Sequence, residues 1–390
     1  MHRTSIAVEE QGSLWEGAAL VAGTAIGGGM LAIPLYTFQG GFAQACIASL
    51  IAWACLTATG LAFCRVLSVS PDQQSFLSLV GRWLGHRWQP VISLIFMGLI
   101  WLLLVAYCAG GAALVPNGPL PSFCTSLLFV IPLGIALSRG RATTSRINSW
   151  LFTLLIAVGL LFALLAGPQW DGERLLSGTQ KLSGWWWALP VLFAAFGFHN
   201  VLPTVRMRMG PDLKRLTRAV LLGTSLALGL ILGWQALVFG CLNQAELSEI
   251  ARLGQPVTCS VAMKSSWATL FSIASLLFAY LAMATSFLGV AQAGLEVMRQ
   301  RWGERRYLAS LLLLVGSAWI AAQIYPDIFG RALSAAGGFG VTLLNGCLPI
   351  AMLFGAVRMQ RLQLHRWEPL LWMAIGAVAL IPAIIELLPR

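Results

Sequence analysis

Hydrophobic residues fall into eleven long runs along this chain, separated by short polar segments. Each run is long enough for an α-helix to cross a bilayer, which takes about 17–25 residues. We therefore expect an all-α integral membrane protein with eleven spanning helices. The expected spans are 14–38, 42–66, 89–115, 121–138, 148–167, 185–207, 217–240, 266–297, 307–324, 332–357 and 369–388.

Composition supports this class and excludes others. Of the 390 residues, 58% are hydrophobic and 10% are charged, whereas soluble domains carry about 25% charged residues. A soluble enzyme, a disordered protein and a nucleic-acid binder are therefore excluded. The spans leave no room for a separate soluble domain, so residues 1–390 are expected to form a single transmembrane domain.

The net charge of +11 reflects topology. If the N-terminus is cytoplasmic, 19 of the 25 Lys and Arg residues fall in inner segments. Such an excess is the positive-inside pattern, and it predicts a periplasmic C-terminus. Nucleic acid is not implied as a partner. The six remaining basic residues are Arg174, Lys181, Arg252, Lys264, Arg331 and Arg390.

Two loops and one cysteine pair carry weaker signals. Apolar residues at helical spacing in 76–84 predict a short helix lying at the membrane interface, or a plain loop packed on the bundle. The polar outer loop 241–265 could act as a lid. Cys241 and Cys259 both fall near this loop and could form a disulfide.

Two spans are interrupted at similar depth. Span 14–38 contains three consecutive glycines, Gly27–Gly29, each of which weakens a helix by up to about 1 kcal/mol relative to Ala. Span 185–207 contains Gly197, two polar residues and Pro203, which lacks a backbone donor and should free the carbonyl one turn back. Broken backbone in a bilayer is tolerated only where it lines a cavity or is covered by protein. We therefore expect a polar site where these breaks meet.

The breaks are five spans apart, which predicts an inverted repeat. Residues 14–167 would form the first group of five spans and 185–357 the second, with 369–388 as an extra helix. Groups with an odd number of spans are inverted relative to one another, as in many secondary transporters.

The chemistry expected at this site suits an amino acid. Free N–H groups near Gly28 and Gly29 lie at the positive end of a helix and would bind a carboxylate. Carbonyls between Gly23 and Ile26 would accept from an ammonium group or coordinate a cation. The alternative is that the glycines only allow close helix packing.

The sequence at these breaks resembles the bacterial aromatic amino acid permeases, the tryptophan- and tyrosine-specific transporters of the hydroxy/aromatic amino acid permease family. The resemblance extends over nearly the whole chain and departs from the family at Asn200, where a small residue is common. The matching stretches are Gly23-Thr24-Ala25-Ile26-Gly27-Gly28-Gly29-Met30-Leu31-Ala32-Ile33-Pro34, Ala106-Tyr107-Cys108-Ala109-Gly110-Gly111, Phe196-Gly197-Phe198-His199-Asn200 with Leu202-Pro203, and Thr285-Ser286-Phe287-Leu288-Gly289-Val290.

The resemblance implies the leucine-transporter fold, in which spans 1, 2, 6 and 7 rock as a bundle against a scaffold of spans 3, 4, 8 and 9. It implies uptake of tryptophan or tyrosine through a bacterial inner membrane by ion-coupled symport, with H⁺ as the usual coupling ion, no cofactor and a monomeric chain in lipid. The substrate-binding residues would be Ala25, Ile26, Gly27, Gly28, Gly29, Tyr107, Phe196, Gly197, Phe198, His199 and Asn200.

Several of these residues have more than one interpretation. His199 is the only histidine within an expected span; it could contact substrate, carry a proton or bond a backbone carbonyl. Tyr107 could bond the substrate carboxylate or only pack. Phe196 and Phe198 could stack on an aromatic substrate or only pack.

The coupling ion stays open. Candidates for coupling are Gly23, Ile26, His199, Thr285 and Ser286. In sodium-coupled members of this fold, hydroxyls at the positions of Thr285 and Ser286 bind Na⁺ together with carbonyls of span 1, and hard cations prefer such oxygens. Alternatively, both hydroxyls bond carbonyls of their own helix.

Other membrane functions fit less well. A membrane enzyme would need paired carboxylates or histidines at metal spacing, and no span contains them. A channel would need a repeated filter, whereas the two broken spans differ. A primary pump would need a phosphate-binding Gly-Lys-Ser/Thr loop, which the sequence lacks. A sodium-coupled or broader neutral amino acid permease remains the main alternative.

Overall fold

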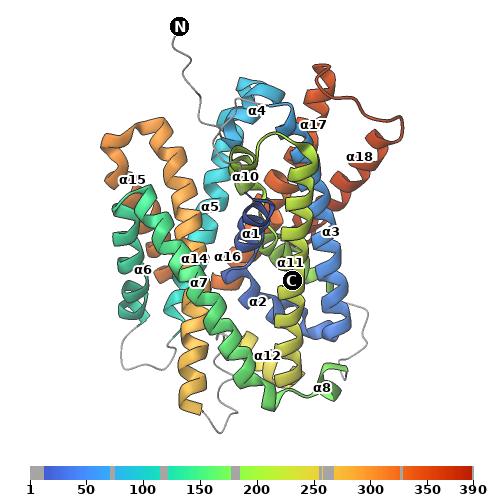
Figure 1. Ribbon diagram of the computed structural model, residues 1–390. Helices are drawn as coiled ribbons and strands as arrows, with labels where there is room; N and C mark the ends of the chain where they lie inside the picture. Colours follow the sequence, from blue (N-terminus) through green and yellow to red (C-terminus); the bar gives the residue numbers. More distant parts are fainter. Residues whose placement is uncertain are drawn as a thin grey trace.

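The computed structural model describes residues 13–70, 75–114, 122–176, 185–253, 257, 268–325 and 328–388. Within these ranges the chain is helical and contains no strand (Figure 1). The helices are α1 Leu14–Ala25, α2 Gly28–Thr37, α3 Gly41–Ser68, α4 Phe76–Leu84, α5 Gln89–Ala112, α6 Ser122–Ser138, α7 Arg141–Ala166, α8 Gly172–Leu176, α9 Leu189–Ala195, α10 Leu202–Met209, α11 Leu213–Cys241, α12 Gln244–Leu253, α14 Ala268–Trp302, α15 Tyr307–Ile324, α16 Phe329–Ala335, α17 Leu348–Arg358, α18 Glu368–Ala379 and α19 Ile381–Leu387.

Helix occupies each of the eleven ranges expected to span the membrane. Nine helical runs in the described part of the chain are long and apolar enough to cross a membrane. The count differs from eleven because range 14–38 is divided into α1 and α2, and α2 forms one run with α3, Gly28–Ser68. The apolar stretch of α6, Phe123–Ser138, is shorter than a full span. The chain is therefore an all-helical, multi-pass membrane protein, as predicted.

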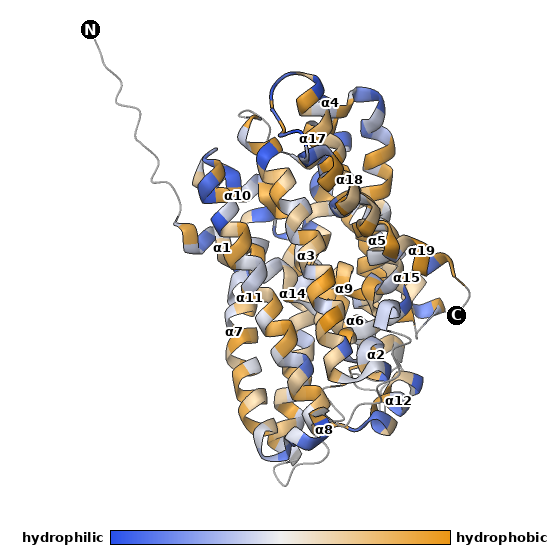
Figure 2. Cartoon of the chain, turned by 90° about the vertical axis from the view of Figure 1, so that its right-hand side faces the viewer, coloured by the Kyte–Doolittle hydropathy of each residue, from blue (hydrophilic) through white to orange (hydrophobic). Residues whose placement is uncertain are grey.

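Hydrophilic residues gather at the two ends of the helix bundle. Figure 2 shows them at α4 and α10 at one end and at α8 and α12 at the other, with hydrophobic residues between. The chain turns back between α2 and α3. Gly41, at this turn, has φ +72°, a conformation that favours glycine.

α4 is present as a helix, and its apolar residues are packed against the bundle. Phe76, Val80 and Trp83 are all buried, and α4 packs on α5 and α17. The indole N–H of Trp83 donates to Ser70 Oγ at 2.9 Å. The apolar residues of this helix therefore stabilise its packing on the bundle.

The outer loop predicted as 241–265 contains α12. Gln244 Nε2 donates to Phe38 O at 3.1 Å, which attaches the start of α12 to the end of α2. Cys241 is buried, and its sulfur lies 3.8 Å from Ala166 O. The disulfide expectation is not tested, since Cys259 lies outside the described residues.

Glycines let α1 approach α11 closely. A Cβ at Gly223 of α11 would lie 2.5 Å from Ala18 O and 2.7 Å from Val21 Cβ. Small residues at helix interfaces are how membrane helices gain van der Waals contact. The first half of span 14–38 is therefore held against the seventh span.

A buried polar network joins α2, α3 and α11. The Thr37 hydroxyl shares its proton between Ile33 O at 3.0 Å and Gln235 Oε1 at 3.2 Å, and Gln235 Nε2 donates to Ser49 Oγ at 3.0 Å. All three side chains are at most 1% exposed. The amide oxygen and the amide nitrogen of Gln235 thus each have a hydrogen-bond partner. In an apolar environment an unpaired polar group would be costly.

We expect Gln235→Leu to lower the stability of the protein. The substitution removes two interhelical hydrogen bonds, which contribute about 0.6–1.7 kcal/mol each in membrane proteins. The thermal midpoint of purified protein should fall. Gln363→Leu, at an exposed side chain, is the matched control and should leave the midpoint unchanged. Equal midpoints for Gln235→Leu and wild type would show that the network does not stabilise the fold.

A second set of polar contacts joins other helices. Trp101 of α5 donates through its indole N–H to Ser317 of α15 at 3.1 Å. Trp319 and Gln323 of α15 both donate to Ser126 Oγ of α6 at 3.0 Å. Helices α5, α6 and α15 are therefore linked to one another, as α2, α3 and α11 are.

Residues Ala336–Cys347 form a π-helix, η8, between α16 and α17. Single π-turns are the usual form, and they are frequent at functional sites. Gly337 allows η8 to meet α9, because a Cβ there would overlap Pro190 O. This wide helix lies against the first half of the broken span 185–207.

Candidate functional site

The first helix break falls where three glycines predicted it. α1 ends at Ala25, Ile26 and Gly27 are extended, and α2 begins at Gly28. The first N–H groups of a helix have no acceptor within it. One of them, the Gly28 N–H, donates to Ser286 Oγ at 3.0 Å. The positive end of α2 is thus directed at polar side chains of α14.

The second break lies between α9 and α10. α9 ends at Ala195, the Phe198 N–H donates to Phe196 O at 3.0 Å, and His199–Val201 form one 3-10 turn, η5. Pro203 belongs to the first turn of α10, where a missing N–H costs little. The expectation that Pro203 frees a carbonyl was wrong, because it begins a helix instead of interrupting one.

The two breaks lie against each other. A Cβ at Gly29 would lie 3.4 Å from Ala195 Cα, so the start of α2 touches the end of α9. A Cβ at Gly197 would lie 3.4 Å from Asn345 Nδ2 of η8. Three irregular helical segments therefore meet at one place.

Tyr107 of α5 and Ser286 of α14 cover the first break. A Cβ at Gly28 would lie 2.8 Å from Tyr107 Cε1 and 3.2 Å from Met283 Cγ. A Cβ at Gly27 would overlap Ser286 Oγ. Glycine is required at both positions for this close approach. The packing interpretation of these glycines is therefore true of this conformation, and it does not exclude a site.

Thr285 and Ser286 are already paired within the protein. Thr285 Oγ1 donates to Leu281 O at 2.9 Å, with Ala282 O at 3.2 Å. Ser286 Oγ donates to Ala282 O at 3.0 Å while it accepts from Gly28. Both hydroxyls thus bond their own helix, the alternative interpretation made from the sequence. No group of three or more His, Cys, Asp or Glu side chains that could hold a metal occurs in the described part of the chain.

His199 is fully buried and pairs through one ring nitrogen. Nε2 lies 3.0 Å from Thr59 Oγ1 of α3, and Nδ1 has no hydrogen-bond partner among the described residues. The imidazole stacks on Phe198, with ring centroids 4.6 Å apart. The Phe198 ring in turn lies over Gly60, where a Cβ would be 2.7 Å from Cζ.

The structure brings most predicted residues together but not all. Ala25 and Ile26 are buried at the first break, and Phe196 is buried at the second. Gly23 lies at the edge of the cluster around the two breaks, since a Cβ at Gly23 would be 3.4 Å from Phe152 of α7. Asn200 is exposed, so its side chain is outside the packed cluster.

Sequence reasoning missed four residues of this cluster: Thr59, Gly60, Met283 and Asn345. The first two stand together in α3, a hydroxyl and a glycine inside a largely apolar span. Asn345 is a buried amide in the tenth expected span. A polar residue inside a membrane helix is a recognisable signal, and it could have drawn attention to Asn345.

Comparisons with known proteins agree with this picture. The tryptophan/tyrosine permease family model matches residues 10–377. Tyrosine-specific transport system 1 of Haemophilus influenzae is 28% identical over 351 residues, which cover 87% of each chain. The tryptophan-specific transport protein of Pseudomonas aeruginosa is 26% identical over 343 residues, 83% of this chain and 82% of that protein. Glutamine transporter 2 of Aliivibrio fischeri is 24% identical over 364 residues, 90% and 92%.

Proposed function

Because the chain belongs to the tryptophan/tyrosine permease family, and is accordingly a permease and not an enzyme, we propose that it imports tryptophan or tyrosine through a bacterial inner membrane by ion-coupled symport. The observation that carries this proposal is the meeting of the two helix breaks beside Tyr107 and the stacked pair Phe198–His199. A polar site formed where two spanning helices are interrupted, with aromatic side chains beside it, suits an amino acid with an aromatic side chain.

The α-carboxylate of the substrate binds at the start of α2. The N–H groups of Gly28 and Gly29 lie in the first turn, where backbone donors and the helix dipole favour an anion. In the present conformation Ser286 Oγ accepts from the Gly28 N–H at 3.0 Å. We propose that a carboxylate oxygen replaces this hydroxyl when substrate binds.

The aromatic ring of the substrate lies toward the second break. Phe198 and His199 present two stacked rings, and offset or edge contacts between aromatic rings contribute about 0.5–1.5 kcal/mol beyond area burial. Both side chains are fully buried here. Substrate entry therefore requires this region to open, and at the first break Gly28 would have to separate from Tyr107 and Met283.

Alternating access would supply that separation. Helices α2, α3 and α11 share the Gln235 network, and α5, α6 and α15 share the Ser126 and Ser317 contacts. We propose that these sets belong to the moving bundle and to the scaffold of a leucine-transporter fold with a five-plus-five repeat. Relative motion of two rigid groups around a central site is how such transporters work.

The coupling ion is proposed to be H⁺, with His199 as the candidate carrier. Its Nδ1 is buried without a partner in the described residues, and intramembrane ionisable groups commonly mark proton pathways. The Na⁺ alternative would use oxygens of Thr285, Ser286 and the carbonyls from Gly23 to Ile26. Both hydroxyls would have to leave their own-helix acceptors to coordinate it.

Thr285→Val should leave proton-driven uptake within about twofold of wild type. Valine keeps the shape of threonine, and the lost hydroxyl bonds only carbonyls of its own helix. Uptake into proteoliposomes with an imposed pH gradient measures this. Thr224→Val is the matched control, since Thr224 is also buried and bonds its own helix at Leu221 O. Loss of uptake in Thr285→Val alone would favour the Na⁺ site.

A broader neutral amino acid permease is the second candidate, and the similarity to a protein named glutamine transporter 2 favours it. Equilibrium binding of radiolabelled tryptophan, tyrosine and glutamine to the purified protein distinguishes the two. We expect tryptophan or tyrosine to bind at least about tenfold more tightly than glutamine, a difference of about 1.4 kcal/mol in the free energy of binding. Equal binding of glutamine would support the broader permease.

A further inference from the structure

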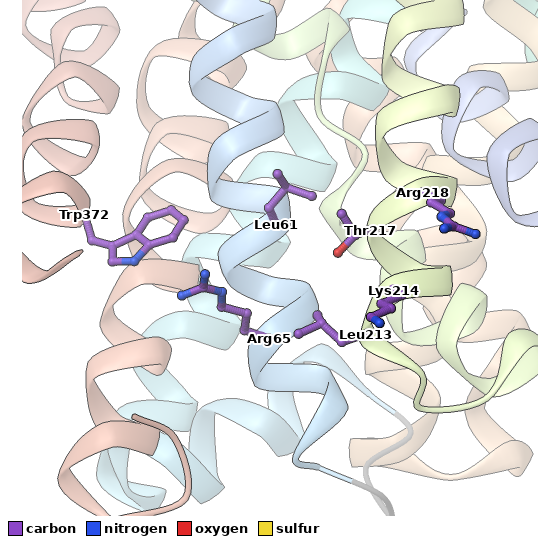
Figure 3. A pocket seen from close by; sticks show the side chains of 7 residues that line it. All are labelled: Leu61, Arg65, Leu213, Lys214, Thr217, Arg218 and Trp372. Atoms are coloured by element: carbon purple, nitrogen blue, oxygen red, sulfur yellow. The ribbon is translucent and has the colours of Figure 1, made fainter. Parts of the chain in front are cut away.

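A basic pocket lies between α3, α11 and α18, at the last turns of α3 and the first turns of α11. Its volume is about 400 Å³. Leu61 and Arg65 come from α3 and Trp372 from α18, while α11 contributes Lys214, Thr217 and Arg218 (Figure 3). The pocket belongs to the end of the bundle where the basic loops gather, and it is separate from the helix breaks.

One cation of this pocket is neutralised and fixed. Arg65 Nη1 donates to Glu368 Oε1 at 2.7 Å, and the Glu368 side chain is only 8% exposed. The guanidinium also lies over the Trp372 ring, 5.7 Å from its centroid, within the range of a cation–π contact. Arg65 thus connects α3 to α18 and forms one wall of the pocket.

The other two cations have no counter-ion among the residues that the structure describes. Lys214 and Arg218 are one helical turn apart on α11, are both exposed, and form no ion pair within the described part of the chain. Asp212 is the nearest acid along the chain, and its carboxylate caps α11 by accepting from the Lys214 backbone N–H at 2.8 Å. Two positively charged residues therefore lie on the α11 side of the pocket with Thr217 between them in sequence, and in Figure 3 the Arg218 side chain extends to the side of α11 away from Arg65.

The pocket also has apolar walls that continue away from the charges. Leu61, Leu213 and Trp372 line it. Farther along α11, Leu222 and Leu226 are exposed apolar side chains one and two helical turns beyond Arg218. Cations beside a strip of exposed aliphatic side chains match a ligand with an anionic head and a hydrocarbon tail.

We propose that this pocket binds the phosphate headgroup of an anionic phospholipid, with the acyl chains along α11. A phosphate would accept from Lys214, Arg218 and Thr217. Basic pockets between membrane helices are suited to such headgroups. A free phosphate shares the head chemistry but would leave the apolar walls uncovered, so the lipid is the better match.

Lipid binding to the purified full-length protein tests this proposal. Phosphatidylglycerol and phosphatidylcholine are titrated in detergent, and bound lipid is counted by native mass spectrometry. Wild type should bind phosphatidylglycerol at least about tenfold more tightly than phosphatidylcholine. Lys214→Gln with Arg218→Gln should weaken phosphatidylglycerol binding about tenfold or more. Arg305→Gln with Arg306→Gln removes the same charge at exposed positions outside the pocket and should bind like wild type.

Three results would overturn the proposal. Equal binding by both double variants would show that the pocket does not recognise the headgroup. Equal binding of phosphatidylcholine would show that the net negative charge of the headgroup does not contribute to recognition. Displacement of phosphatidylglycerol by inorganic phosphate at the same concentration as the lipid would assign the pocket to a free anion. Matching thermal midpoints of the two double variants exclude misfolding as the cause of a difference.

Discussion

Gly28→Leu is expected to lower amino acid uptake by about 100-fold while the protein stays folded. The first atom of the new side chain would lie 2.8 Å from the Tyr107 ring and 3.2 Å from Met283 Cγ. Overpacking of this kind costs about 1–3 kcal/mol, less than the 5–15 kcal/mol stability of a typical domain. The same side chain would fill the space in which the substrate carboxylate meets α2.

Initial rates of labelled tryptophan uptake in proteoliposomes measure this effect, with the thermal midpoint recorded for each variant. Gly98→Leu is the matched control, because Gly98 lies on α5 with Tyr107 and a Cβ there would meet nothing within 4 Å. The control should transport at the wild-type rate. Normal uptake by Gly28→Leu would remove the start of α2 from the binding site.

His199→Ala is expected to raise the substrate concentration for half-maximal uptake about tenfold. It removes the Thr59 contact at 3.0 Å and the ring stacked on Phe198. A lost hydrogen bond and a lost ring contact of about 0.7 kcal/mol each total about 1.4 kcal/mol, which corresponds to tenfold. The pH dependence of uptake should also flatten if His199 carries the coupling proton.

Thr59→Val separates the two contributions of His199. It removes only the hydrogen bond and keeps the imidazole and its stacking on Phe198, so the half-maximal concentration should rise about threefold. If His199→Ala leaves both the half-maximal concentration and the pH profile unchanged, His199 has only a structural role. An effect of Thr59→Val equal to that of His199→Ala would assign the whole effect to the hydrogen bond.

Much of the fold could be predicted from the sequence because its strongest signals are local. Apolar runs place helix in every expected span, and Gly27–Gly29 mark the end of α1 within two residues. Pro203 was harder to interpret, because the same residue interrupts a helix interior or begins a helix, and only the course of the chain before it decides.

The parts that could not be predicted depend on contacts between distant segments. Thr59 meets His199 across 140 positions of the chain, and Ser286 meets Gly28 across 258. The π-helix η8 follows from its packing on α9, and no local pattern distinguishes it from an α-helix. Asn200, adjacent to His199, is exposed because the 3-10 turn η5 directs successive side chains to different sides.

The interpretation of the glycines also needed both kinds of information. From sequence alone, Gly27 and Gly28 either permit close packing or expose backbone for a ligand. The structure has α2 begin at Gly28, with the Gly28 N–H turned toward Ser286 and the Cα against Tyr107. We propose that the glycines serve close packing in this conformation and leave the N-terminus of α2 accessible when substrate binds.

Uptake of labelled tryptophan and tyrosine into proteoliposomes, with H⁺ and Na⁺ gradients imposed separately, tests the proposed function most directly. We expect accumulation of at least one of them under the H⁺ gradient alone, and about 100-fold slower uptake by the Gly28→Leu variant. Accumulation that requires Na⁺ would contradict the proposed coupling and move it to Thr285 and Ser286. No accumulation of either amino acid under both gradients would contradict the proposed substrate.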